Sequence, residues 1–154
     1  MKHTTRWVLS ITEEEPPDEV AEVKCWGWSQ QPGCVPLSRK ILLKWLASHD
    51  ASNYGEDAAL CFDELLANAI RIPSPTGLTE TKWLLYEDRL RVEVNDWSPS
   101  APFISRPKAD SESGRGLILV HLLADAWGYV HTTFLHPEGE GFMPGKTVWF
   151  ELYK

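Results

Sequence analysis

Near the middle of the chain the sequence reads FDELLANAIR (residues 62–71). These residues belong to a predicted helix over residues 56 to about 72, in which apolar side chains recur every three or four positions, as on the buried face of an amphipathic helix. Glu64 and Asn68 lie four positions apart in it, so their side chains project from the same face. A carboxylate and a carboxamide on one edge of an apolar helix equally fit a solvated surface, so the pair identifies no site by itself.

The segments on either side show the periodicities of further helices and strands. In residues 90–95 apolar and polar side chains alternate strictly, as in a strand with one buried face. From residue 37 to about residue 49 the apolar spacing becomes helical, and Pro36 and Ser38 are suitable residues for the start of that helix. The remaining predicted elements are a helix from Gly116 to Ala126 that stops at Gly128, and strands over residues 7–11, 20–28, 81–87, 129–135 and 146–153.

The order of these elements predicts an α+β fold, a two-layer α/β sandwich with helices on one face of a mixed, mainly antiparallel sheet. The chain has 154 residues without an internal repeat or linker, so we expect a single domain over residues 1–154. We expect most of its eight tryptophans in the core. Some of them are also candidates for a partner or dimer interface, among them Trp26, Trp28, Trp45 and Trp149.

The chain is acidic, with a formal net charge of -7. Direct binding to nucleic acid or to an anionic membrane needs clustered Lys and Arg, so we expect neither. The first residues lack the apolar core of a signal peptide, and no apolar run reaches the length of a membrane span, so the expected location is cytoplasmic. In that compartment Cys25, Cys34 and Cys61 are expected to be reduced structural thiols, with a disulfide between Cys25 and Cys34 as the alternative.

Two further features follow in the sequence. Asp96 stands directly after the alternating strand and before a long loop rich in Pro and Ser over residues 97–113; alone, it also fits a turn residue that bonds to its own backbone. The second feature is a turn of Gly114, Arg115 and Gly116 at the start of an apolar helix. Its glycines permit close approach of the backbone, and the helix start favours an anion such as phosphate, although such glycine spacing also occurs in many loops.

Together and in this order, the three features resemble the nucleotide site of the Bergerat-fold (GHKL) ATPase superfamily, which includes gyrase, histidine kinases and anti-sigma kinases. The blocks that carry the resemblance are ELLANAIR, LRVEVND, ESGRGLILVHLLADAWG and GKTVWFEL. They are most similar to the stand-alone bacterial regulatory proteins of the anti-sigma factor serine/threonine kinase type, over roughly residues 37–152. The resemblance implies ATP and Mg2+ as cofactors.

The resemblance also implies a role for each of these residues. Asn68 is expected to ligate the Mg2+ that bridges the ATP phosphates, and Glu64, one helical turn earlier, to act as the general base or to position the nucleophile. Asp96 is expected to accept a hydrogen bond from the adenine amino group and thereby to favour ATP over GTP. Gly114, Arg115 and Gly116 correspond to the glycines of a lid, which close over the phosphates with their backbone N–H groups.

Three features depart from the family pattern. Ile72 stands where relatives usually carry His, and Trp97 and Pro99 follow the aspartate where relatives often have glycine. The lid contains Arg106, Lys108 and two prolines. The tryptophan and the proline stiffen the segment that should approach adenine, so weaker or altered nucleotide binding is the alternative expectation.

Two functions are therefore compatible with the sequence. In the first, the protein is a serine/threonine kinase that phosphorylates an anti-anti-sigma partner and also sequesters a sigma factor. In the second, it is a non-catalytic nucleotide-binding or protein-interaction module that controls such a regulator. Glu64 favours the first function, and Trp97 with the missing glycines favours the second. A homodimer is expected from the resemblance alone.

Overall fold

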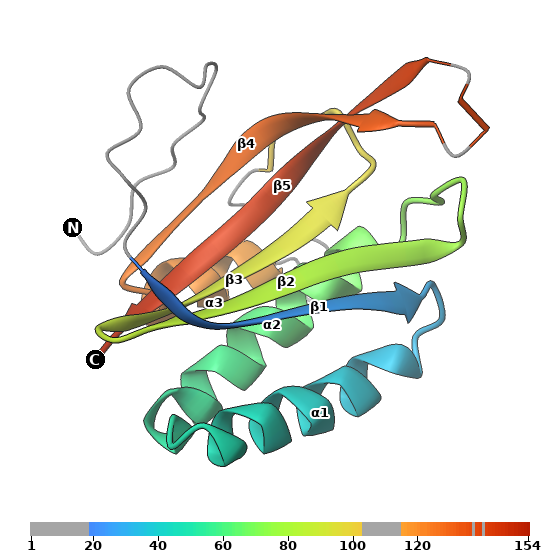
Figure 1. Ribbon diagram of the computed structural model, residues 1–154. Helices are drawn as coiled ribbons and strands as arrows, with labels where there is room; N and C mark the ends of the chain where they lie inside the picture. The colour runs from blue at the N-terminus through green and yellow to red at the C-terminus, as the bar shows by residue number, and fades with distance from the viewer. Residues whose placement is uncertain (1–18, 103–114, 137, 140) are drawn as a thin grey trace.

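The computed structural model describes residues 19–102, 115–136, 138–139 and 141–154. The described strands form one sheet in the order β1-β2-β3-β5-β4, and every pairing in it is antiparallel. These strands are β1 (Val20–Ser29), β2 (Leu78–Tyr86), β3 (Arg89–Asp96), β4 (Ala126–Leu135) and β5 (Phe142–Tyr153). The helices α1 (Cys34–Ser48), α2 (Gly55–Ala69) and α3 (Arg115–Leu123) cover one face of the sheet (Figure 1). The predicted α+β sandwich is therefore confirmed.

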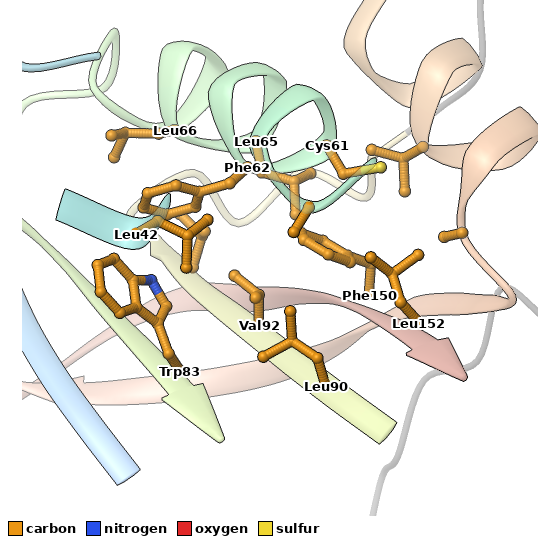
Figure 2. Packing of buried hydrophobic residues seen from close by; sticks show 14 of the residues in the cluster. Leu42, Cys61, Phe62, Leu65, Leu66, Trp83, Leu90, Val92, Phe150 and Leu152 are labelled. Carbon is orange, nitrogen blue, oxygen red and sulfur yellow. The ribbon is translucent and has the colours of Figure 1, made fainter. Parts of the chain in front are cut away.

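The hydrophobic core lies between the helices and the sheet, and strand β3 shows how the sequence places it there. Leu90, Val92 and Val94 are buried, as the predicted alternation requires. From the other layer, Phe62 of α2 projects toward the strands (Figure 2). Its ring meets the fully buried ring of Trp83 edge-on, with the ring centres 5.6 Å apart.

Several tryptophans gather around Trp83. Trp28 is buried, and its ring stacks on Trp83 with the ring centres 6.2 Å apart. Trp26 and Trp45 are partly buried and pack against the same core. Trp149 belongs to the opposite face of β5 and is not part of this cluster. Trp127 is also buried in this core, so five of the eight tryptophans belong to it or pack against it, and the expectation for most of them is confirmed.

The ends of α1 and α2 differ from the predicted ends. Helix α1 begins at Cys34 rather than at residue 37, so Pro36 lies in its first turn, where the backbone N–H has no partner within the helix in any case. Ser38 consequently lies inside the helix rather than at its start. Helix α2 ends at Ala69 rather than near residue 72, and the backbone N–H of Ile72 bonds to the carbonyl oxygen of Ala69 in a tighter turn.

The prediction that the third helix runs to Ala126 and stops at Gly128 is wrong. Helix α3 ends at Leu123, and Gly128 lies inside β4. The chain enters the sheet early because the backbone N–H of Asp125 donates to the carbonyl oxygen of Glu151 on β5, at 3.0 Å. This long-range bond ends the helix before the glycine is reached.

The last strand is also longer than predicted. Strand β5 begins at Phe142 rather than at Lys146, so β4 and β5 form a long hairpin. The predicted strand over residues 7–11 and residues 103–113 of the predicted loop lie outside the described residues. None of the helices in the described ranges is long and apolar enough to cross a membrane.

The three cysteines are free thiols, as predicted, and the alternative disulfide between Cys25 and Cys34 is not formed in this structure. Cys25 is exposed, whereas Cys34 and Cys61 are buried. Burial, together with the negative charges of Asp57 and Glu64 on the same helix, raises the pKa of the Cys61 thiol to about 12. Burial also raises the pKa of the Cys34 thiol. The buried thiols are therefore inert core side chains at neutral pH.

Candidate functional site

A cavity of about 280 Å³ opens between α2, the first turn of α3, the end of β3 and the adjacent part of β5. Leu65 and Ala69 of α2 form one wall, and Val94 and Val148 of the sheet form the opposite one. Such a volume lies just below the range of roughly 300–1,000 Å³ typical of small-molecule sites. Two apolar walls that face each other suit a flat ring system, which buries both of its faces between them.

Asp96 and Lys146 form an ion pair in the lining of this cavity. The Lys146 ammonium nitrogen lies 3.4 Å from one oxygen of the Asp96 carboxylate. The other carboxylate oxygen accepts a hydrogen bond from the backbone N–H of Ser98 at 2.8 Å. The ammonium also donates to the Ser98 carbonyl oxygen at 3.2 Å, so the pair is fixed to the chain that follows β3.

The fold buries this pair because Asp96 and Lys146 are register partners on β3 and β5. The exposed fractions of their side chains are 9% and 7%. Both residues continue the faces of their strands that carry the core, and each places one charge where an apolar side chain would otherwise stand. Buried charges occur in proteins chiefly as such pairs.

Sequence reasoning assigned no role to Lys146. The signal that could have found it is its position on β5, in step with Val148, Phe150 and Leu152, whose side chains face the core. A lysine in the register of a core-facing row needs a buried partner. Asp96, at the matching end of β3, is that partner.

Asn68 lines the cavity from α2, as its predicted role requires. Among the described residues its side-chain amide makes no hydrogen bond, so the amide oxygen is available to a ligand. Glu64 lies one turn earlier on the same helix, half-buried, but is not among the residues that line the cavity. The structure therefore brings Asn68 and Asp96 to one cavity and leaves Glu64 beside it.

The predicted glycine turn falls partly outside the described residues, because Gly114 is not described. Arg115 and Gly116 are the first two residues of α3. Leu117 follows them, is buried and lines the cavity. The start of α3, where backbone N–H groups lack partners within the helix, thus lies at the edge of the cavity.

The departures from the family pattern have clear positions. The ring of Trp97 packs against Phe134 of β4, with the ring centres 4.7 Å apart, and neither Trp97 nor Pro99 lines the cavity. Asp96 therefore keeps its place in the cavity despite the residues that follow it. Ile72 lines the cavity and adds to its apolar surface. Arg106 and Lys108 lie outside the described residues.

The described residues include no group of three His, Cys, Asp or Glu side chains that could hold a metal ion by themselves. The donor set at the cavity fits a different arrangement, in which one amide oxygen, from Asn68, contributes to the coordination of Mg2+. Magnesium in phosphate-bound sites usually takes one or two protein oxygens and completes its octahedron with phosphates and water. The residues present therefore fit a nucleotide-bound ion.

Comparison with known proteins finds a family match over most of the chain. Residues 29–141, most of the chain, match the family model of the histidine kinase-like ATPase domain. The matched range runs from the end of β1 to the tip of the β4–β5 hairpin and includes Glu64, Asn68 and Asp96, whereas Lys146 lies beyond it. No curated protein matches the sequence directly.

Proposed function

We propose that this chain, which belongs to the family of histidine kinase-like ATPase domains, binds Mg-ATP in the cavity between α2, the end of β3 and β5 and transfers phosphate to an anti-anti-sigma partner. One observation carries the proposal: Asn68, Asp96 and the first turn of α3 come from distant parts of the chain and meet at one cavity. In this reading the protein is a serine/threonine kinase that also binds a sigma factor.

The cavity supplies a separate feature for each part of the nucleotide. The apolar walls around Val94 and Val148 hold the base, and the Asp96 carboxylate accepts a hydrogen bond from its amino group. The backbone N–H groups at the start of α3 favour the negative phosphates. Asn68 would hold the magnesium ion through its amide oxygen, and the ion supplies neutralisation of the phosphate charge.

Glu64 is the carboxylate proposed to act in phosphate transfer. The hydroxyl oxygen of the partner's serine or threonine forms a bond to the γ-phosphorus, and the bond from that phosphorus to the bridging oxygen of ADP breaks. The hydroxyl proton passes to the Glu64 carboxylate, which leaves phosphoserine or phosphothreonine and ADP. The position of Glu64, one turn before Asn68 on α2, supports this role because it places the carboxylate beside the end of the cavity that would hold phosphate.

A second function is favoured by two other observations. Asp96 already has Lys146 and the Ser98 N–H as partners, and Glu64 does not line the cavity. Both fit a non-catalytic module in which a bound nucleotide only shapes a surface for a regulatory protein. In that case the chain binds the nucleotide and its partner but transfers no phosphate.

Isothermal titration calorimetry of the chain with ATP, in the presence and absence of Mg2+, tests the binding. The absence of both heat and a shift in melting temperature at millimolar Mg-ATP would refute it. Incubation with labelled ATP and candidate anti-anti-sigma proteins then separates the two functions. Transfer of the γ-phosphate supports the kinase, and nucleotide binding without transfer to any candidate supports the binding module.

A further inference from the structure

The carboxylate of Asp96 and the ammonium of Lys146 present a hydrogen-bond acceptor and a donor to the cavity in an order that the fold fixes. The ammonium nitrogen lies 3.4 Å from one carboxylate oxygen. The other carboxylate oxygen accepts from the Ser98 backbone N–H at 2.8 Å, and the ammonium donates to the Ser98 carbonyl oxygen at 3.2 Å. Because β3 and β5 also pair through Asp96 and Lys146, the acceptor and the donor cannot exchange places.

We propose that Lys146 is a specificity-determining residue of the nucleotide site, whose ammonium donates a hydrogen bond to N1 of adenine while Asp96 accepts one from the 6-amino group. The inference rests on the proposed binding of a nucleotide in this cavity, and it adds a second contact to the base where Asp96 alone supplies one. In this role the lysine contacts the ligand as well as neutralising the aspartate.

Adenine carries the complementary pair of groups on one edge. Its 6-amino group donates and the neighbouring ring nitrogen N1 accepts, and both are bonded to the same ring carbon, so a carboxylate and an ammonium in contact can reach them together. An oxo purine such as hypoxanthine has an accepting oxygen at position 6 and a donating N1–H. The carboxylate would then face the oxygen and the ammonium would face the N1–H. The fixed pair therefore favours adenine at both positions and opposes an oxo purine at both.

The burial of the pair selects the N1 edge of the ring. N7 also accepts beside the amino group, but it belongs to the five-membered ring that carries the ribose. The exposed fractions of the Asp96 and Lys146 side chains are 9% and 7%. A ring that reaches such buried groups enters with the edge farthest from the ribose, because the sugar and the phosphates need space that the buried groups do not leave. That edge carries N1.

The ammonium of Lys146 keeps a donor for the ligand. An ammonium has three N–H donors, and in the described part of the chain its contacts are the Ser98 carbonyl oxygen and the Asp96 carboxylate. A donor therefore remains for N1. The walls of the cavity are otherwise mostly apolar, and a hydrogen bond made in such surroundings is electrostatically stronger than in water.

Calorimetric titration with ATP and two deaza analogues, each with Mg2+, tests the inference. In 1-deaza-ATP a C–H replaces N1 and the amino group stays, so the analogue removes only the acceptor assigned to Lys146. In 7-deaza-ATP the same replacement is made at N7, away from the pair. We expect the parent protein to bind 1-deaza-ATP about ten to a hundred times more weakly than ATP, as for the loss of a charged hydrogen bond, and 7-deaza-ATP with nearly the affinity of ATP.

Lys146→Met separates contact with the base from a purely structural role. If the ammonium binds N1, the variant binds ATP more weakly than the parent does, and ATP and 1-deaza-ATP then bind to it with equal affinity. If the lysine only neutralises Asp96, the variant weakens both nucleotides by the same factor. Lys82→Met is the matched control, because Lys82 is an exposed lysine on β2 and the chemical change is the same. It should keep the parent's preference for ATP over 1-deaza-ATP.

Equal affinities of the parent for ATP and 1-deaza-ATP overturn the inference and leave the proposed function standing. So does a preference for ATP over 1-deaza-ATP that persists in Lys146→Met, or a loss of affinity for 7-deaza-ATP in place of 1-deaza-ATP, which assigns the contact to N7. If Lys146→Met does not fold, the comparison of the three nucleotides in the parent still decides. A parent that binds none of the three overturns the proposed function, and the inference with it.

Discussion

Replacing Asp96 with alanine should destabilise the fold as well as the site. The substitution removes the carboxylate that faces Lys146 and leaves a buried ammonium whose side chain is 7% exposed. Breaking a buried ion pair by removing one partner costs about 3–5 kcal/mol of the free energy of unfolding. The Ser98 carbonyl remains as a hydrogen-bond acceptor for the ammonium, which favours the lower end of this range.

The loss is large relative to the whole stability of a domain, which is typically about 5–15 kcal/mol. For a chain of this length each kilocalorie corresponds to roughly 2–4 °C, so the melting temperature of Asp96→Ala should fall by roughly 6–20 °C. Urea denaturation of the parent, of Asp96→Ala, of Lys146→Met and of the double variant measures the effect. The double variant removes both charges, so it should be less destabilised than the sum of the single variants, by about 0.5–3 kcal/mol.

Additive effects of the two substitutions, or a loss below about 0.5 kcal/mol in Asp96→Ala, would show that the two side chains are not a buried pair in solution. The same denaturation measurements are the folding control for the nucleotide-binding experiments. A weakened affinity in Asp96→Ala reports on base recognition only where the fraction folded, taken from the denaturation curves, is close to one.

The other predictions concern the remaining residues of the site and its surroundings. Asn68→Ala should lose the Mg2+-dependent part of ATP affinity and keep the parent's melting temperature, because its amide makes no hydrogen bond to the described residues; equal affinities with and without Mg2+ in the parent would contradict the role. Glu64→Gln should keep nucleotide binding and abolish phosphate transfer, whereas Glu56→Gln, at an exposed position on the same helix, should leave both binding and transfer unchanged. Equal transfer by Glu64→Gln and parent removes Glu64 from the mechanism. Gly145→Ala should cost about 1–3 kcal/mol in urea denaturation, because its Cβ would stand 2.7 Å from the Asp96 carbonyl oxygen and against the Phe134 ring; unchanged stability would show that the strands are less tightly packed there. The pKa of the Cys61 thiol is raised to about 12 in the folded protein, whereas the thiol of the unfolded chain loses its proton above a pKa of about 8.5. Deprotonation therefore favours the unfolded chain, and the free energy of unfolding should fall above about pH 8.5 by up to about 1.4 kcal/mol per pH unit. Cys61→Ala should remove this part of the decline, and identical alkaline profiles for the two proteins would refute the assignment.

Much of the fold could be predicted from the sequence because several elements carry strong local patterns. The alternation in β3 identified its buried face, and the spacing of apolar residues identified α2 with Glu64 and Asn68 on it. Local patterns were insufficient where contacts between residues far apart in the sequence determine the end of an element. The end of α3 depends on the bond between Asp125 and Glu151, which no property of the helix sequence indicates.

The site shows the same division. The positions of Asn68 and Asp96 at one cavity follow from motifs that the sequence displays, although their roles remain predictions. Lys146 was missed because a single lysine in a strand is ordinarily an exposed side chain. Its burial follows from the register between β3 and β5, which depends on the whole sheet. Residues 103–114 lie outside the described residues, so the proposed lid stays a prediction from the resemblance.

The pairing of β3 with β5 also has a kinetic consequence. Ser98 and the Lys146 that binds it are separated by 48 positions, and α3 and β4 lie between them in the chain. Contacts of such long sequence separation close large loops and are slow to form relative to helices and local hairpins. The end of the cavity that carries both charges therefore does not exist until β5 has joined β3. Ligand binding at that end would appear late in refolding, and it would distinguish a finished molecule from a compact intermediate that already has its helices.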